Sequence, residues 1–234
     1  MFPLGTSRQA ENTPWITYGL IVVNVLVFFW ELTLSSSELG QQFYALAVVP
    51  CQMTRNFFTV DTVFDTVRSM FLHGGWVHLI GNMLFLYIFG PLVEDYLGKF
   101  RYLFFYLVAG FVASFLHAAI NWNVCVPSIG ASGAIYGVMG GFVLLYPSTR
   151  IRTVAFFFRV PIGTVNVQAF YMLFYFFAVD LINGLMRLGP DTIQTTGVAF
   201  WAHVGGFLAG LILAFCFTLF RDPPPVDAFE YMDD

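Results

Sequence analysis

The 234 residues of this chain are 58% hydrophobic and only 10% charged, with a formal net charge of −4. Soluble domains usually carry about 25% charged residues, so this composition excludes an ordinary soluble protein and predicts an integral membrane protein. No basic stripe runs along the chain, and binding to nucleic acid therefore has no support.

Apolar runs recur six times, which predicts an all-α, polytopic bundle of six transmembrane helices. In chain order, the predicted spans are residues 15–34, 76–97, 100–120, 132–146, 167–185 and 200–220. Together they form one membrane domain, residues 15–220, preceded by a mixed-polarity segment at 1–14. An outer loop at about residues 35–75 is expected to lie on or in the interface and to contain a short helix after Asp61. Residues 221–234 form an acidic tail that we expect to be disordered.

The positive charges predict the orientation of the bundle. With the N-terminus in the cytoplasm, only Arg55, Arg68 and Arg187 lie outside, and the remaining seven of the ten Lys and Arg residues lie inside. Both termini are then cytoplasmic, and the fourth and sixth spans each begin at the outer face.

The fourth predicted span is short and begins with Ser132, between two glycines. The 15 residues from Ser132 to Tyr146 cover about 22 Å at 1.5 Å per residue, whereas the hydrocarbon core is about 30 Å thick. If the far end of this helix reaches one membrane face, the Ser132 hydroxyl lies below the opposite face. Glycine and serine are also common in tightly packed membrane helices, so this stretch alone leaves a purely structural interpretation open.

A nucleophilic serine needs a base, and His203 lies near the outer end of the sixth span, at a depth similar to that of Ser132. Small residues, which let helices approach closely, recur every four positions on both helices, at Ala202, Gly206 and Gly210 and at Gly133, Gly137 and Gly141. A lone histidine here would more often bond a carbonyl or reach for the interface. Paired with the serine, it predicts a catalytic base.

The second span carries His78 and Asn82 four residues apart, on one helical face. A side-chain amide near a serine nucleophile donates to a developing oxyanion. An interhelical polar clamp is the structural alternative, and the spacing does not separate the two.

Three of these stretches resemble motifs of the rhomboid family of intramembrane serine proteases. They are Gly130-Ala131-Ser132-Gly133 with Tyr136, His78-Leu79-Ile80-Gly81-Asn82 preceded by residues 71–75, and residues 202–210 with Gly206 and Gly210. They occur in the family's order, over roughly residues 15–220. The Trp-Arg pair that some bacterial members carry in the first outer loop does not occur here, which leaves the anchoring of that loop open.

The resemblance implies a Ser–His dyad without a carboxylate, with Ser132 as nucleophile and His203 as base. It also implies an oxyanion hole formed by the Ser132 backbone N–H and the side chains of Asn82 and His78, and a Tyr136 ring stacked on His203. The implied substrate is a transmembrane segment of another membrane protein, cut near its extracytoplasmic face. The compact six-span form suggests a prokaryotic plasma membrane.

Three further features have competing interpretations. By family resemblance, the six aromatic residues of the fifth span are expected to form a gate and the loop at 187–199 a cap over the site. For most of these aromatic residues, simple contact with lipid is the favoured alternative. For Asp180 in the same span, a structural hydrogen bond is favoured over a catalytic part. Cys51 and Cys125 both fall in outer loops, and unpaired thiols are favoured over a disulfide, which an oxidising exterior would allow.

Glu94 and Asp95 are expected to pair with Lys99 and Arg101. No His-Glu-x-x-His pattern, clustered cysteines or phosphate loop occurs, so we expect no metal and no cofactor. Two other classes stay open: a catalytically silent relative that binds membrane helices, and a small transporter, which the lack of an internal repeat disfavours.

Overall fold

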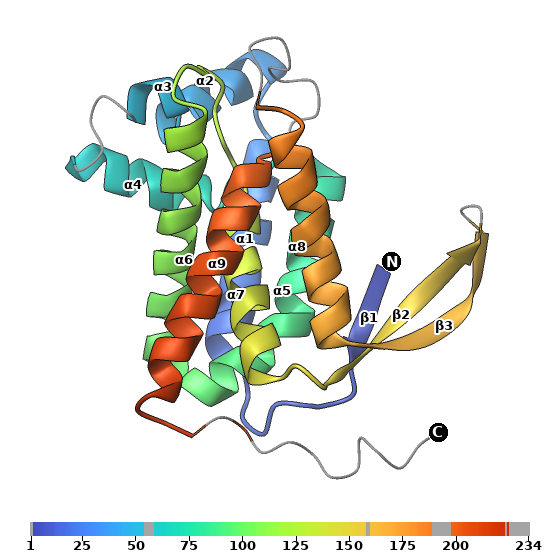
Figure 1. Ribbon diagram of the computed structural model, residues 1–234. Coiled ribbons are helices and arrows are strands. Elements are labelled where there is room, and N and C mark those ends of the chain that lie inside the picture. The colour runs from blue at the N-terminus through green and yellow to red at the C-terminus, as the bar shows by residue number, and fades with distance from the viewer. Residues whose placement is uncertain (1, 54–58, 158–159, 189–197, 223, 225–234) are drawn as a thin grey trace.

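The computed structural model describes residues 2–53, 59–157, 160–188, 198–222 and 224, which form nine helices and three strands (Figure 1). The helices are α1 (Trp15–Glu31), α2 (Ser36–Leu46), α3 (Pro50–Met53), α4 (Val60–Ser69), α5 (Trp76–Leu97), α6 (Lys99–Ile120), α7 (Ser132–Leu145), α8 (Ala169–Leu185) and α9 (Phe200–Thr218). The strands are β1 (Phe2–Thr6), β2 (Arg150–Phe157) and β3 (Val160–Gln168). The acidic tail predicted at 221–234 lies almost wholly outside the described residues.

Three of the described helices, α5, α6 and α9, are long and apolar enough to cross a membrane. Helices α1, α7 and α8 are apolar but shorter, with 17, 14 and 17 residues. The protein is therefore a mostly helical membrane protein, as its composition predicts. The six predicted spans correspond to these six helices, but the count of six spans stays a prediction because only three reach spanning length.

Helix α7 lies at the centre of the bundle, in contact with α5, α6, α8 and α9 (Figure 1). Its sequence is apolar or small all round, which is typical of a buried helix, and 11 of its 14 residues are buried. Only Ser132, Tyr136 and Leu144 are partly exposed. Ser132 and Tyr136 lie one turn apart, so they share one face of the helix.

The all-α prediction is wrong in one respect, because the chain also contains a three-stranded antiparallel sheet in the order β1–β2–β3. The β2–β3 hairpin occupies the stretch between α7 and α8, and it extends away from the bundle at the end where α7 finishes (Figure 1). This stretch is rich in the β-branched residues that favour strands. The other partner of β2 is β1, which comes from the mixed-polarity N-terminal segment, and in this pair Phe2 lies opposite Val154.

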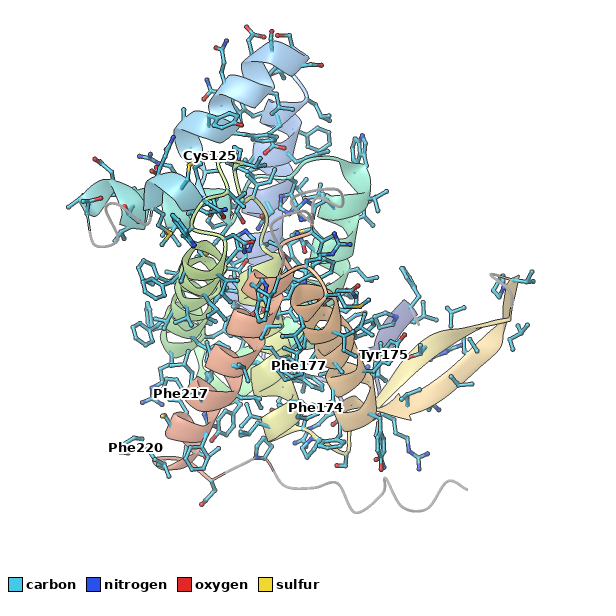
Figure 2. All side chains as sticks on the ribbon, turned by 45° about the horizontal axis from the view of Figure 1, so that its top comes forward. Cys125, Phe174, Tyr175, Phe177, Phe217 and Phe220 are labelled. Carbon is cyan, nitrogen blue, oxygen red and sulfur yellow. A yellow bond between two sulfur atoms is a disulfide. The ribbon has the colours of Figure 1, made fainter. Side chains whose placement is uncertain are left out.

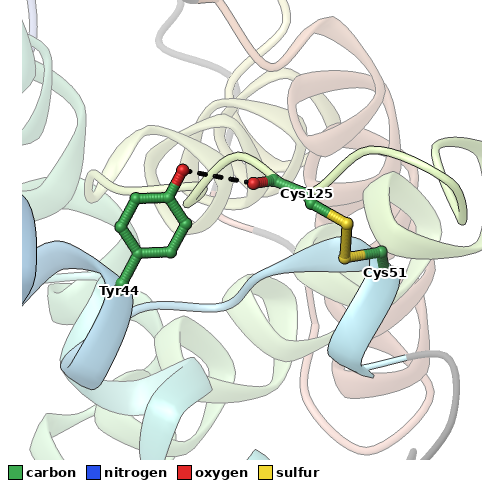
Figure 3. Close-up of a disulfide and its surroundings, with 3 residues drawn as sticks. All are labelled: Tyr44, Cys51 and Cys125. Carbon is green, nitrogen blue, oxygen red and sulfur yellow. Dashed lines mark hydrogen bonds between the residues drawn. A yellow bond between two sulfur atoms is a disulfide. The ribbon is translucent and has the colours of Figure 1, made fainter.

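The segment between α1 and α5 folds into the short helices α2, α3 and α4, and α4 overlaps the helix predicted after Asp61. A disulfide joins Cys51 at the start of α3 to Cys125, in the loop that leads into α7 (Figure 3). The Tyr44 hydroxyl donates to the Cys125 carbonyl oxygen at 3.3 Å, and Val48 and Ser128 form an isolated β-bridge. The favoured prediction of unpaired thiols is therefore wrong.

Glu94 and Asp95 bind the start of α1 instead of the predicted Lys99 and Arg101. The Glu94 carboxylate accepts hydrogen bonds from the backbone N–H of Ile16 and Thr17 at 2.9 and 2.8 Å. Asp95 accepts from the Glu11 and Asn12 amides at 3.0 and 3.2 Å. Helix α1 has no side-chain cap or first-turn acid of its own, so its free amides and positive dipole end attract the Glu94 carboxylate, while Asp95 binds the residues just before the helix.

Candidate active site

Ser132 is the first residue of α7, and the turn that presents it depends on Gly130. This glycine has φ +118°, a conformation that disfavours any side chain, and its N–H donates to the Ser69 carbonyl oxygen at 2.8 Å. A Cβ atom at Gly130 would lie 2.6 Å from the His78 ring. As the first helical residue, Ser132 contributes one of the amides that have no acceptor within the helix, at the positive end of the helix dipole.

The Ser132 hydroxyl meets the imidazole of His203, which comes from the first turn of α9. Oγ of Ser132 lies 2.9 Å from Nε2 of His203, within the distance for proton transfer. Both side chains are partly exposed, so the hydroxyl is accessible although it belongs to a buried helix.

Glycines allow α7 and α9 to come close enough for this contact. A Cβ atom at Gly206 would overlap the carbonyl oxygen of Gly133, and one at Gly210 would overlap that of Gly137. The small-residue face predicted on α9 therefore packs against α7. On α7, the predicted face of Gly133, Gly137 and Gly141 packs mainly on α6: an added Cβ would lie nearest to Ala113, Ala109 and Phe105 of that helix, and at Gly133 and Gly137 it would also approach α9. Gly140, outside the predicted face, meets α9 through the Phe207 carbonyl.

The second ring nitrogen of His203 contacts a carboxylate of α8. Oδ2 of Asp180 lies 2.8 Å from Nδ1 of His203, and Asp180 is 8% exposed. The sequence favours a structural hydrogen bond for this residue and does not identify its partner. That partner is the imidazole beside Ser132.

Tyr136, one turn after Ser132, stacks on the His203 ring. The ring centroids are 4.2 Å apart and the planes differ by 6°. The Tyr136 hydroxyl is also close enough to the Asp180 carboxylate to interact with it. The imidazole is thus held by its two nitrogens and by one face.

A cluster of polar side chains from α5 and the preceding loop lies beside Gly130. Nδ2 of Asn82 is 2.9 Å from Nε2 of His73, and the rings of His73 and His78 meet edge to face at 5.0 Å. Asn82 is 8% exposed. Because the amide has two N–H groups and one meets His73, the other is available to a ligand.

His73 is a site residue that the sequence motifs do not single out, although it lies only nine positions before Asn82. It is 1% exposed, and its backbone N–H donates to Glu31 Oε1 at 2.9 Å. Burial lowers the pKa of His73 to about 4. The neutral ring fits its neighbours with the proton on Nδ1, which lies 3.3 Å from the Phe71 carbonyl oxygen, and with Nε2 accepting from Asn82.

A cavity of about 20 Å³ lies behind the start of α7. Ser69, Ser114 and Ser128 line it together with Ser132. A polar cavity of more than about 10–15 Å³ holds one water molecule. The site therefore has room for a water next to Ser132.

The aromatic residues of α8 divide into two groups. Phe174 and Phe177 (labelled in Figure 2) pack on Phe207 of α9, with ring centroids 5.7 and 4.8 Å apart. Phe176 meets Phe85 of α5 at 5.5 Å. Phe170, Tyr171 and Tyr175 are 46%, 65% and 49% exposed. The loop expected as a cap, residues 187–199, lies mostly outside the described residues. Among the residues that the structure describes, no three His, Cys, Asp or Glu side chains form a possible metal site.

Fold and site together define a polytopic helical membrane protein with a serine–histidine pair between two helices packed through glycines. The sequence model of the rhomboid domain matches residues 50–220, nearly three-quarters of the chain. The chain therefore belongs to the rhomboid family, and the resemblance seen in its motifs is confirmed.

Individual relatives support the same assignment. RHOMBOID-like protein 4 of Arabidopsis thaliana is 34% identical over 156 residues, 66% of this chain and 34% of that protein. Rhomboid protease AarA of Providencia stuartii is 25% identical over 224 residues, 87% and 73% of the two chains. Rhomboid protease GluP of Bacillus subtilis is 29% identical over 207 residues, 87% and 35%. The chain spans about a third to a half of the length of the plant relatives it matches.

Proposed function

We propose that this protein is an intramembrane serine endopeptidase that cleaves transmembrane segments of other membrane proteins near the extracytoplasmic face. The observation that carries the proposal is the 2.9 Å contact between Ser132 Oγ and His203 Nε2 inside a membrane bundle. Two relatives that match most of this chain, AarA and GluP, are named rhomboid proteases.

In the first half of the reaction, Nε2 of His203 removes the hydroxyl proton as Ser132 Oγ attacks the scissile carbonyl. The oxyanion that forms is stabilised by the Ser132 backbone N–H, the free N–H of Asn82 and the His78 ring. The imidazolium then gives its proton to the departing amine, and the acyl group stays on Ser132. Donors fixed in advance at the oxyanion account for much of the rate in such sites, at about 10²–10³-fold each.

In the second half, water must reach the acyl group within the membrane. The cavity behind α7 lies next to Ser132 and is large enough for one water. With His203 as base, this water hydrolyses the ester and restores the hydroxyl.

The substrate presents a helix whose peptide bonds are hidden by its own hydrogen bonds, so it must unwind locally before cleavage. Residues with low helix propensity near the cut reduce that cost. In the proposed orientation, the Ser132 end of α7 faces outward and both termini are cytoplasmic. The compact bundle and the bacterial relatives support a prokaryotic plasma membrane.

The test uses the full chain in proteoliposomes with a fluorogenic transmembrane peptide. Cleavage by the wild-type protein and its loss in Ser132→Ala and His203→Ala are expected, together with labelling of Ser132 by a fluorophosphonate probe. Ser36→Ala, at an exposed position of α2, is the matched control and keeps full activity. Cleavage that persists without Ser132 rejects the protease assignment, and binding of the peptide without any cleavage favours the helix-binding alternative.

A further inference from the structure

We infer that Asp180 positions His203, so that the site works with three residues, Ser132, His203 and Asp180, instead of the dyad implied by family resemblance. This inference rests on the proposed protease function. Two hydrogen-bond distances carry it, 2.9 Å from Ser132 Oγ to His203 Nε2 and 2.8 Å from His203 Nδ1 to Asp180 Oδ2. The three groups come from α7, α9 and α8.

The carboxylate determines which ring nitrogen of His203 carries the proton. An ionised carboxylate only accepts hydrogen bonds, so Nδ1 donates to Asp180 and Nε2 is left with its lone pair facing the Ser132 hydroxyl. This is the tautomer that a general base needs. When His203 takes the hydroxyl proton, the imidazolium has an anion directly behind it.

The surroundings of Asp180 leave it with few other roles. Its side chain is 11% exposed and that of His203 is 12% exposed. A buried carboxylate needs a charged or hydrogen-bonding partner, and the groups that face Asp180 are the His203 ring and the Tyr136 hydroxyl. The other titratable groups near the imidazole are His78 of α5 and His117 of α6.

The packing of α8 on α9 fixes the carboxylate at the height of the imidazole. Gly184, one turn after Asp180, lies under the indole of Trp201, where an added Cβ would be 3.1 Å from the ring. Trp201 is two residues before His203. The absence of a side chain at Gly184 thus lets α8 approach the very turn of α9 that carries the base.

The competing explanation is that Asp180 only ties α8 to α9. We compare Asp180→Asn with the wild type, measuring kcat and KM for transmembrane peptide cleavage from pH 5 to 9. The matched control is Glu94→Gln, which removes another buried carboxylate, one that caps α1 far from the site. Asp180→Glu tests rescue by a carboxylate of similar chemistry.

For a positioning residue, Asp180→Asn lowers kcat about 10²–10⁴-fold with KM nearly unchanged. It also changes the pH profile of kcat, because no carboxylate then faces Nδ1 of His203. Asp180→Glu recovers part of kcat. Glu94→Gln lowers the thermal unfolding midpoint but leaves the pH profile in place. If Asp180→Asn is destabilised like Glu94→Gln but keeps the kcat and pH profile of the wild type, Asp180 only holds α8 against α9 and the inference is overturned.

Nitrogen-15 NMR of the histidines gives a readout that does not require turnover. The signals of His203 are assigned by their loss in His203→Gln. We expect the Nδ1–H tautomer in the wild type and its loss in Asp180→Asn. An unchanged tautomer overturns the inference even if the protease stands, whereas an inactive wild-type protein with the expected tautomer rejects the proposed protease function alone.

Discussion

The imidazole of His203 is restrained by contacts of different kinds, and each can be removed separately. Ser132 and Asp180 hold its two nitrogens, while Tyr136 covers one face with the ring planes only 6° apart. The hydrogen bonds set the tautomer. The stacked ring limits rotation about the side-chain bonds, so it contributes to rate through orientation.

Replacing Tyr136 by Phe and by Ala separates its ring from its hydroxyl. Tyr136→Phe keeps the stacking and loses only the contact with Asp180, so we expect kcat to fall no more than about threefold. Tyr136→Ala removes a contact between rings worth about 0.5–1.5 kcal/mol, and kcat should fall roughly tenfold. Steady-state cleavage assays measure both. Equal losses in the two variants would show that the hydroxyl, not the ring, is what matters.

His73 makes the stability of the site depend on pH. Its pKa in the folded protein is about 4, below the ordinary value of about 6.5, because burial disfavours the charged ring. The unfolded chain therefore binds this proton more readily. The stabilisation by neutral His73 is complete above about pH 6.5 and is lost as the pH falls through 4, with a total of about 3 kcal/mol.

We expect acidification from pH 7.5 to 4.5 to destabilise the wild type more than His73→Gln, as measured by the thermal unfolding midpoint of each. Protonated Nε2 would also face the Asn82 amide hydrogen, so kcat should drop over the same range of pH. The same acid sensitivity in His73→Gln and in the wild type would assign the effect to other groups.

At the scale of elements, helical geometry explains where the small-residue prediction succeeds and where it fails. Four residues turn an α-helix through about 400°, so each step of four drifts by about 40°. Gly133 and Gly137 lie between α6 and α9, and the drift carries Gly141, about 80° away from Gly133, fully onto α6. Gly140, seven residues after Gly133, lies about 20° to the other side and faces α9.

The close packing of α7 against α9 predicts contrasting effects of a Gly→Ala substitution at Gly206 and at Gly19. In Gly206→Ala, the new methyl group would overlap the Gly133 carbonyl oxygen, so α7 and α9 must move apart. We expect a loss of about 1–3 kcal/mol in stability and at least tenfold lower kcat. In Gly19→Ala, the methyl group meets nothing within 4 Å, and better helix propensity should stabilise α1 by about 0.5–1 kcal/mol. Thermal unfolding and peptide cleavage measure both effects. Similar behaviour of the two variants would contradict the packing argument.

The sequence predicts those features that depend on residues near one another in the chain. The apolar runs, the Ser132 turn and the small-residue spacing are of this kind, and all six helices follow from them. The contact of Asp180 with His203 joins two helices across 23 positions, and the pairing of β1 with β2 joins segments about 150 residues apart. Neither leaves a periodic pattern. The β-branched residues of 150–168 favour strands, but this stretch lies between two apolar helices and is not distinguished from a connecting loop by the sequence alone.

At the scale of the whole molecule, the disulfide and the positive charges support the same orientation. Cysteines pair in oxidising compartments, and Cys51 and Cys125 lie in the segments that the distribution of Lys and Arg places outside. The disulfide joins α3 to the loop before Ser132. It thus connects the segment between α1 and α5 to the turn that presents the hydroxyl.

Removing this disulfide should destabilise the protein without altering its chemistry. The two cysteines are 74 positions apart, and closing a loop of that length restricts the unfolded chain by about 4 kcal/mol in the simplest model. Helices that persist in the unfolded state in detergent reduce this effect, so we expect a loss of about 2–4 kcal/mol in Cys51→Ser. Cys216→Ser, at an exposed free thiol of α9, is the control. Thermal unfolding of the wild type with and without reductant gives the measurement. An equal unfolding midpoint in the two conditions would mean that α2, α3 and α4 keep their positions without the disulfide.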